Sequence, residues 1–187
     1  MRTNRRDFIK AISVPVAGAL LIPGCARKPH GPYLVLSALE ADTLIALCEQ
    51  LIPADDYAGA TEAGVVYFFD KQLSNRGNYS EQLAFYQQGL AIVNNCCRNL
   101  HNTSFAKMDI EAQYDFLKKL EGGKVADKSW KMADQRKFFN TLLDHTMQAF
   151  YGAPRHGGNK QYVSYAMMGI QYPLVIGQNR YDHLENE

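Results

Sequence analysis

The residues best suited to binding lie in one stretch near the C-terminus, where positions 150–159 read FYGAPRHGGN. The stretch follows a long segment with helical periodicity, so Gly152 is well placed to end that helix with a positive φ, which costs glycine little. Pro154 cannot continue a helix, and Gly157 and Gly158 allow backbone conformations or close approaches that a side chain would block. The composition therefore predicts a tightly shaped loop.

This loop presents three good hydrogen-bonding side chains, Arg155, His156 and Asn159. One interpretation is a helix stop followed by a simple turn. The other is a shaped contact loop that binds a partner protein or a ligand, and nothing in the local sequence separates those two uses. His156 has no acid or metal partner evident in the sequence, so the loop is not expected to perform acid–base chemistry.

Cysteine is the next residue type that could carry chemistry. Cys48 and Cys97 both fall on the apolar stripes of expected helices. A disulfide between them is one possibility in an oxidising compartment, and buried free thiols are the alternative. Cys96 points about 100° away from its neighbour on a helix. The chain has no Cys-x-x-Cys pair, which argues against zinc and dithiol redox sites, and no Cys-x-x-Cys-His sequence for covalent c-type haem.

No other catalytic or metal-binding set is recognisable in the sequence. Asp55 and Asp56 lack the alternating oxygen ligands of a calcium loop, and His145 lies in an expected helix, where a structural role is favoured over a ligand role. A serine nucleophile elbow, a phosphate loop and a dinucleotide-binding fingerprint are all missing. The sequence therefore predicts no catalytic residue and no cofactor or metal ligand in this chain.

The first 25 residues have the pattern of an export signal. Arg5, Arg6 and Phe8 form a twin-arginine pattern, and the apolar run at 11–22 is too short to span a bilayer as a helix. Cys25 follows Leu-Ile-Pro-Gly, which is similar to a lipobox. We expect export to the periplasm by the twin-arginine translocase and a membrane anchor on lipidated Cys25. The alternative is an N-terminal helix with an incidental arginine pair.

The export route poses a question for the rest of the chain. Twin-arginine export is used by proteins that fold first, often around a cofactor. Since the sequence offers no recognisable cofactor site, the chain either binds a cofactor by an unfamiliar site or travels with a protein that carries one.

The bulk composition favours a single α-helical domain after this signal. The chain has 187 residues and a formal net charge of +1, with no basic block, which argues against a nucleic-acid partner. Phe and Tyr are plentiful, whereas β-branched runs and period-2 alternation are scarce. We expect a linker at 26–36 and a compact all-α domain of five or six helices at 37–187, with no internal repeat.

Capping residues and apolar stripes set the expected helix bounds. Ser37 and Glu40 form a capping box, Ser80 and Asp109 are suitable N-caps, and the helix opened by Asp109 is expected to face inward through Ile110, Tyr114 and Leu117. The expected helices run from about Ala38 to Leu51, Glu62 to Leu73, Ser80 to His101, Ile110 to Leu120, Trp130 to Tyr151 and Gln161 to Met168.

Three separated motifs resemble a known family, the small subunit (subunit 3, or gamma) of gluconate 2-dehydrogenase and related flavin-dependent sugar dehydrogenases. They are the Arg-Arg-Asp-Phe of the leader, the segments CEQLIPAD at 48–55 and GATEAGV at 59–65, and the Phe-Tyr-Gly and Gly-Gly-Asn of 150–159. The end of the chain departs from the family, which usually has a tryptophan after Gly-Gly-Asn; Ser164 and Tyr165 occupy that region here.

The resemblance implies a non-catalytic accessory subunit. In the family, a large subunit of the GMC type carries FAD and oxidises a sugar or sugar acid, and a cytochrome c subunit with haem c often takes the electrons. The small subunit is thought to supply the export signal and to help the large one mature. The chain itself is then expected to hold no cofactor.

The resemblance also gives the loop a use, which is docking of the large subunit. The residues expected to bind that partner are Tyr151, Gly152, Arg155, His156, Gly157, Gly158 and Asn159. The competing hypothesis is a self-contained exported lipoprotein, an enzyme or ligand-binding protein, that uses the Gly-rich loop at 152–159 as its own site.

Overall fold

The computed structural model describes residues 32–74, 80–128 and 130–170. The predicted export signal and lipidation site therefore lie outside the described residues, as does most of the predicted linker. These predictions concern Arg5, Arg6, Phe8 and Cys25.

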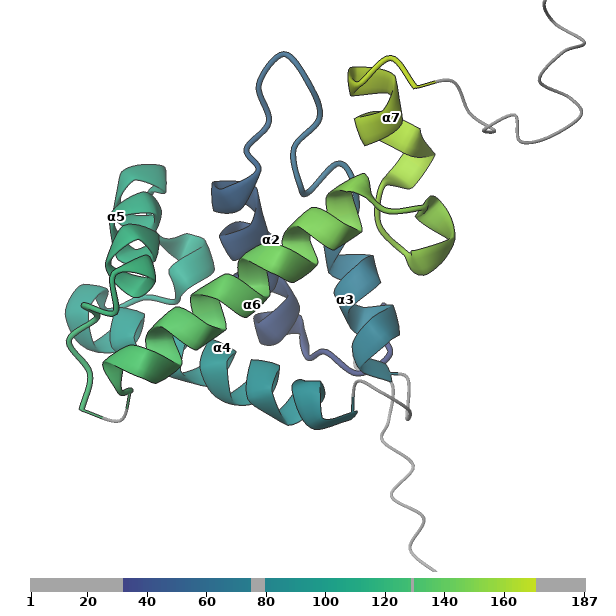
Figure 1. The fold of residues 1–187 in the computed structure, drawn as a ribbon. Helices are drawn as coiled ribbons and strands as arrows, with labels where there is room; N and C mark the ends of the chain where they lie inside the picture. The colour runs from purple at the N-terminus through teal and green to yellow at the C-terminus, as the bar shows by residue number, and fades with distance from the viewer. Residues whose placement is uncertain (1–31, 75–79, 129, 171–187) are drawn as a thin grey trace, which may run out of the picture.

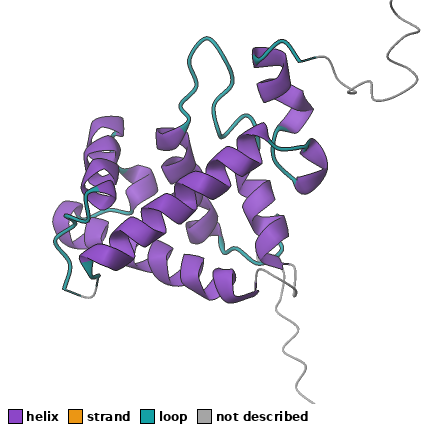
Figure 2. Ribbon diagram, in the orientation of Figure 1, coloured by secondary structure: helices purple, strands orange, loops and turns teal. Residues whose placement is uncertain are grey.

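Six α-helices make up the described part of the chain, which contains no strand (Figure 2). This confirms the all-α prediction. The helices are α2 (Ala38–Leu51), α3 (Val65–Ser74), α4 (Ser80–His101), α5 (Ile110–Glu121), α6 (Met132–Tyr151) and α7 (Val163–Met167), with short 3-10 turns at Phe105–Lys107, Pro154–His156 and Lys160–Tyr162.

The helices pack around α2 and α6. Helix α6 runs diagonally across the face in Figure 1, with α5 on one side, α3 on the other and α4 beneath. Helix α2 lies behind α6 and contacts α3, α4, α5 and α6. The largest fully buried side chains between them are Leu44, Leu47, Phe69, Tyr86, Leu90, Phe105, Phe138, Leu142 and Phe150.

Local capping signals fix the helix starts that the sequence predicted best. The capping box at α2 is complete, because the Ser37 backbone N–H donates to Glu40 Oε2 at 2.7 Å and the Glu40 N–H donates to Ser37 Oγ at 3.3 Å. At α5, the Asp109 carboxylate accepts from the Ala112 N–H at 2.8 Å. Both helices begin at the predicted residues, as each cap satisfies a backbone donor that the first turn leaves free.

Three helices begin later than predicted. Helix α6 starts at Met132 rather than at about Trp130, and the other two start late because the backbone before them takes positive φ angles. Helix α3 starts at Val65 rather than Glu62, since Gly64 has φ +67° and interrupts the helical run. The last helix starts at Val163 rather than Gln161. Asn159, Gln161 and Tyr162 all have positive φ values, which hold the preceding residues in a separate 3-10 turn.

The predicted inward face of α5 is right at Leu117, which is buried, and wrong at Ile110 and Tyr114. Ile110 is 76% exposed and Tyr114 is 54% exposed. Besides Leu117, the buried face carries Gln113, Phe116 and Leu120. Gln113 is inside because its amide donates to the carbonyls of Phe105 and Met108, at 3.0 and 3.2 Å, and so satisfies the turn that precedes the helix.

None of the helices in the described ranges has both the length and the apolar character needed to cross a membrane.

Candidate docking surface

The loop that the sequence singled out is held together by Asn159. The Asn159 side chain is fully buried; its Nδ2 donates to the Gly152 carbonyl at 2.9 Å, and its Oδ1 accepts from the Ser164 N–H at 3.0 Å. Asn159 itself lies in the left-handed region, with φ 48°. One amide therefore ties the end of α6 to the start of α7, and this side chain is committed within the chain.

The loop glycines serve close approaches to the chain's own helices. Gly157 has φ +115°, and a Cβ there would lie 2.8 Å from the Tyr67 carbonyl oxygen on α3. A Cβ on Gly158 would collide with the backbone of Ala149 on α6. The positive φ predicted for Gly152 is wrong. This residue is extended, with φ −73°, and the left-handed turn comes five residues later, after Pro154 has started a 3-10 turn.

Backbone carbonyls of the loop are bound by side chains of α3. Lys71 Nζ donates to the Arg155 carbonyl at 2.6 Å, and Gln72 Nε2 donates to the His156 carbonyl at 3.4 Å. Further along, the Lys160 N–H donates to the Ala63 carbonyl at 2.9 Å. The last bond joins the loop to the connection between α2 and α3, so the two connections form one unit.

The connection between α2 and α3 is organised by Glu49, which sequence reasoning missed. Glu49 Oε1 accepts from the Ala54 N–H at 3.0 Å, and Oε2 accepts from the Thr61 N–H at 2.8 Å. A Cβ on Gly59 would lie 2.5 Å from both Glu49 Oε1 and the Ala54 nitrogen. The sequence signal that could have indicated this role is Glu49 near the end of a helix, followed by Pro53 and then by Gly59.

Asp55 and Asp56 lie in this connection and are not part of a metal cluster. The Asp55 carboxylate accepts from the Tyr57 N–H at 2.8 Å, which closes a local turn. Among the residues that the structure describes, no group of three or more His, Cys, Asp or Glu side chains could hold a metal ion.

Three of the predicted partner-binding residues keep exposed side chains, and we call Tyr151, Arg155 and His156 the candidate docking surface. Tyr151 is 38% exposed at the end of α6, where its ring packs edge-on against Phe150. Arg155 Nε donates to His156 Nε2 at 3.1 Å, so the two neighbouring side chains are paired on the surface. The surface offers one aromatic ring and one guanidinium on a fixed loop.

The cysteines do not form the suggested Cys48–Cys97 disulfide, because all three described cysteines are buried free thiols. The Cys48 sulfur lies 3.3 Å from Thr146 Oγ1 on α6, and the Cys96 Sγ donates to Asp127 at 3.2 Å. Burial raises the pKa of Cys48 to about 12 and that of Cys97 to about 11. The neutral thiols therefore behave as small core residues.

His145 has the structural role that was expected for it. The His145 Nδ1 lies 2.9 Å from the Tyr86 hydroxyl, and the imidazole packs 6.0 Å from the Phe69 ring. Partial burial lowers the pKa of His145, while the neighbouring Asp144 carboxylate opposes that shift. The ring links α3, α4 and α6.

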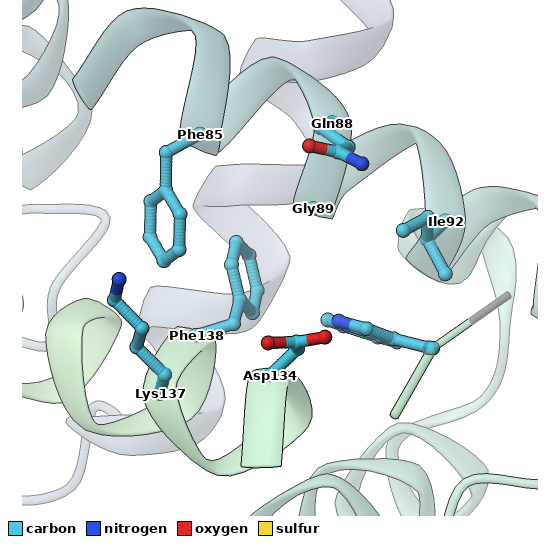
Figure 3. Close-up of a pocket in the computed structure, with 8 residues that line it drawn as sticks. Phe85, Gln88, Gly89, Ile92, Asp134, Lys137 and Phe138 are labelled. Atoms are coloured by element: carbon cyan, nitrogen blue, oxygen red, sulfur yellow. The ribbon is translucent and has the colours of Figure 1, made fainter. Parts of the chain in front are cut away.

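A small hollow between α4 and α6 is a second feature that the sequence did not suggest (Figure 3). It has a volume of about 240 Å³. Phe138 lies against Gly89, where any side chain would collide with the ring, and Lys137 Nζ lies 5.7 Å from the centre of the Phe85 ring. The lining residues are Phe85, Gln88, Gly89, Ile92, Trp130, Asp134, Lys137 and Phe138.

Comparison with known proteins gives one match. The family model described as gluconate 2-dehydrogenase subunit 3 matches residues 38–171. That range begins at the first residue of α2 and includes the candidate docking surface. No curated protein and no solved structure matches significantly.

Proposed function

The chain belongs to the gluconate 2-dehydrogenase subunit 3 family, and we propose that it is the non-catalytic small subunit of a membrane-associated, FAD-dependent oxidoreductase that acts on a sugar or sugar acid. Its role is to support maturation and twin-arginine export of the flavoprotein subunit. The observation that carries this proposal is the family match, which spans all six described helices.

In this proposal the chemistry belongs to the partners. The large GMC-type subunit holds FAD, and a possible third subunit holds haem c. This chain contributes the Arg5–Arg6 signal, a lipid anchor at Cys25 and a binding surface. The complex then resides in the periplasm, attached to the membrane.

The loop geometry supports a docking role for Tyr151 and Arg155. The loop backbone is already hydrogen-bonded to α3 and to Asn159, so little conformational entropy is lost when a partner binds. A guanidinium presents planar donors suited to a carboxylate or to carbonyls of the partner, and a tyrosine ring can be buried while its hydroxyl stays bonded.

Export of the flavoprotein tests the proposed function. Replacing Arg5 and Arg6 together by Lys should leave the flavoprotein subunit in the cytoplasm, because this chain carries the twin-arginine signal for itself and for the flavoprotein. The measurement is flavoprotein antigen and dehydrogenase activity in periplasmic and membrane fractions. The control replaces Lys118 and Lys119, which lie at the end of α5, by Arg. Unchanged export of the flavoprotein would show that it travels independently.

A further inference from the structure

A buried acid on α3 has no role in the docking surface. Asp70 is 3% exposed and accepts three successive backbone N–H bonds, from Leu34 at 2.6 Å, Val35 at 2.9 Å and Leu36 at 3.1 Å. These three hydrogen bonds offset the free-energy cost of burying a carboxylate away from water. They fix the segment that enters the domain firmly against α3.

The side chains around this attachment form an aromatic and basic face, which we call the tyrosine face: Tyr33, Leu34, Tyr67 and Lys71. The rings of Tyr33 and Tyr67 are 6.0 Å apart. Leu34 is 60% exposed and Tyr67 is 47% exposed. Tyrosines beside an exposed leucine and a lysine are the composition found where proteins meet the headgroup layer of a membrane.

The charges near the tyrosine face are mixed but favour an anionic surface. Lys71 is exposed one turn after Tyr67, and the stem of Lys160 lies beside Gly64 next to the Tyr67 ring. Two acids act on the Tyr33 hydroxyl, Asp42 and Asp70, and the Asp70 carboxylate is already bound by backbone N–H groups. Of these two acids, Asp42 is exposed and Asp70 is buried.

The length of chain before residue 32 limits which face can meet the bilayer. Six residues separate Cys25 from Pro32, so seven Cα–Cα steps connect the two. They reach at most roughly 25 Å when fully extended. A folded domain of this size has a diameter of roughly 37 Å, so its far side lies roughly 60 Å away around the surface. An anchor at Cys25 cannot reach that far side.

We propose that the tyrosine face lies on an anionic phospholipid surface when Cys25 is acylated. This inference rests on the lipid anchor in the proposed function. The Tyr33 and Tyr67 rings sit at the headgroup level, Leu34 enters the acyl boundary and Lys71 pairs with phosphate groups. Since Lys71 also binds the Arg155 carbonyl, the candidate docking surface borders this face, and the partner docks beside the membrane.

The test uses the full chain, purified from membranes and reconstituted in vesicles of phosphatidylethanolamine and phosphatidylglycerol. An environment-sensitive fluorophore is attached to Leu34→Cys or, as the control, to Ile110→Cys. Leu34 and Ile110 are both exposed. Ile110 begins α5, which lies on the opposite side of α6 from α3 (Figure 1). The three described native cysteines are buried and do not compete for the label in the folded protein.

We expect lipid-borne quencher to reduce emission at position 34 roughly twofold or more, and to leave position 110 unchanged. An acylated protein whose two labels respond equally overturns the tyrosine-face proposal alone. Protection of position 34 only when the flavoprotein is present also overturns it, because the face then binds protein. Mass spectrometry that finds no acyl group on Cys25 overturns the anchor in the proposed function and this inference together.

Discussion

At the residue scale, the exposed side chains of the docking loop differ from its buried ones in what they can offer a partner. Tyr151 and Arg155 have free faces, whereas Asn159 and the loop glycines are occupied by contacts inside the chain. Substitutions at the exposed positions should therefore change association without changing the fold. Substitutions at the buried positions should change the fold first.

We predict that Tyr151→Ala and Arg155→Ala each weaken association with the flavoprotein by about 1–3 kcal/mol, as truncated interface anchors do. The measurement is pull-down of the flavoprotein at several protein concentrations. The matched control is Tyr114→Ala, since Tyr114 is an exposed tyrosine on α5, away from the loop. Folded variants that hold the flavoprotein as tightly as the wild type would remove the loop from the docking surface.

His145 gives the domain a pH-dependent stability of known sign. Because burial lowers the pKa of His145 in the folded state, the unfolded state binds a proton more readily once the pH falls below about 6.5. Stability contributed by the neutral ring is thus complete above that pH and decreases as the pH is lowered towards the folded pKa.

The expected result is a larger loss of unfolding free energy between pH 7.5 and 5 in the wild type than in His145→Gln, measured by urea denaturation. The difference between the two proteins removes the contribution of other titrating groups. Asp144→Asn provides a second check. Without the opposing carboxylate, the pKa of His145 in the folded state should fall further, so the unfolding free energy of this variant should depend more steeply on pH than that of the wild type. Equal pH profiles for the wild type and His145→Gln would contradict the assignment.

At the element scale, the short turns around α7 depend on one amide more than on their own helical propensity. Replacing Asn159 by Ala leaves the Gly152 carbonyl and the Ser164 N–H without their partner, and it places at φ 48° a residue that lacks the polar side chain with which Asn tolerates the left-handed region. We predict that Asn159→Ala lowers the free energy of unfolding by about 3 kcal/mol.

Two variants separate the causes of that loss. Asn159→Gly relieves the backbone strain but loses both hydrogen bonds, and Asn159→Asp keeps the oxygen that accepts from Ser164. Urea denaturation should find Asn159→Gly more stable than Asn159→Ala, whereas in Asn159→Asp a buried carboxylate oxygen faces the Gly152 carbonyl and lowers the stability further. Hydrogen exchange at the Ser164 amide should rise most in Ala and Gly. Full stability in Asn159→Ala would mean that the contacts of α7 with α6 hold the segment without this amide.

The helices also show where sequence patterns suffice and where they fail. The bounds of α2 and α4 match prediction, because the capping box of α2 and the apolar stripe of α4 are local signals. The face of α5 does not, since a buried glutamine was needed to satisfy carbonyls of a preceding turn. The start of α7 likewise depends on positive φ values around Asn159, whose side chain bonds to Gly152 on one side of the turn and to Ser164 on the other.

The same division applies to the candidate site. A shaped loop could be predicted from its proline and glycines, and the structure confirms that Gly157 and Gly158 permit close approach. Which backbone each glycine would lie against could not be predicted, because α3 and α6 contact the loop only in the tertiary fold. The roles of Glu49 and Asp70 were missed for the same reason, as each carboxylate binds backbone N–H groups across a chain reversal.

At the scale of the whole molecule, helix packing alone holds the described domain, although the expected compartment is oxidising. Disulfides commonly stabilise exported proteins, yet Cys48, Cys96 and Cys97 are free and buried. Their pKa values are raised by burial, that of Cys96 to about 12 with a further contribution from Asp127. Thiols in this state are poor nucleophiles, so they resist oxidation and exchange while the protein is folded.

We therefore predict that the thermal midpoint of the purified mature chain is the same with and without a reductant. A stabilising disulfide would contribute about 3 kcal/mol, and reduction would then lower the midpoint by roughly 10 °C. Thiol counting provides the matched measurement: the three described thiols should react with a small thiol reagent only after unfolding in urea. A midpoint that falls in reductant, or fewer than three thiols in the unfolded, unreduced chain, would show that a disulfide forms. The physical reason for the expected result is that all three thiols are buried and free, and that the sulfurs of Cys48 and Cys96 bond to different neighbours, Thr146 and Asp127.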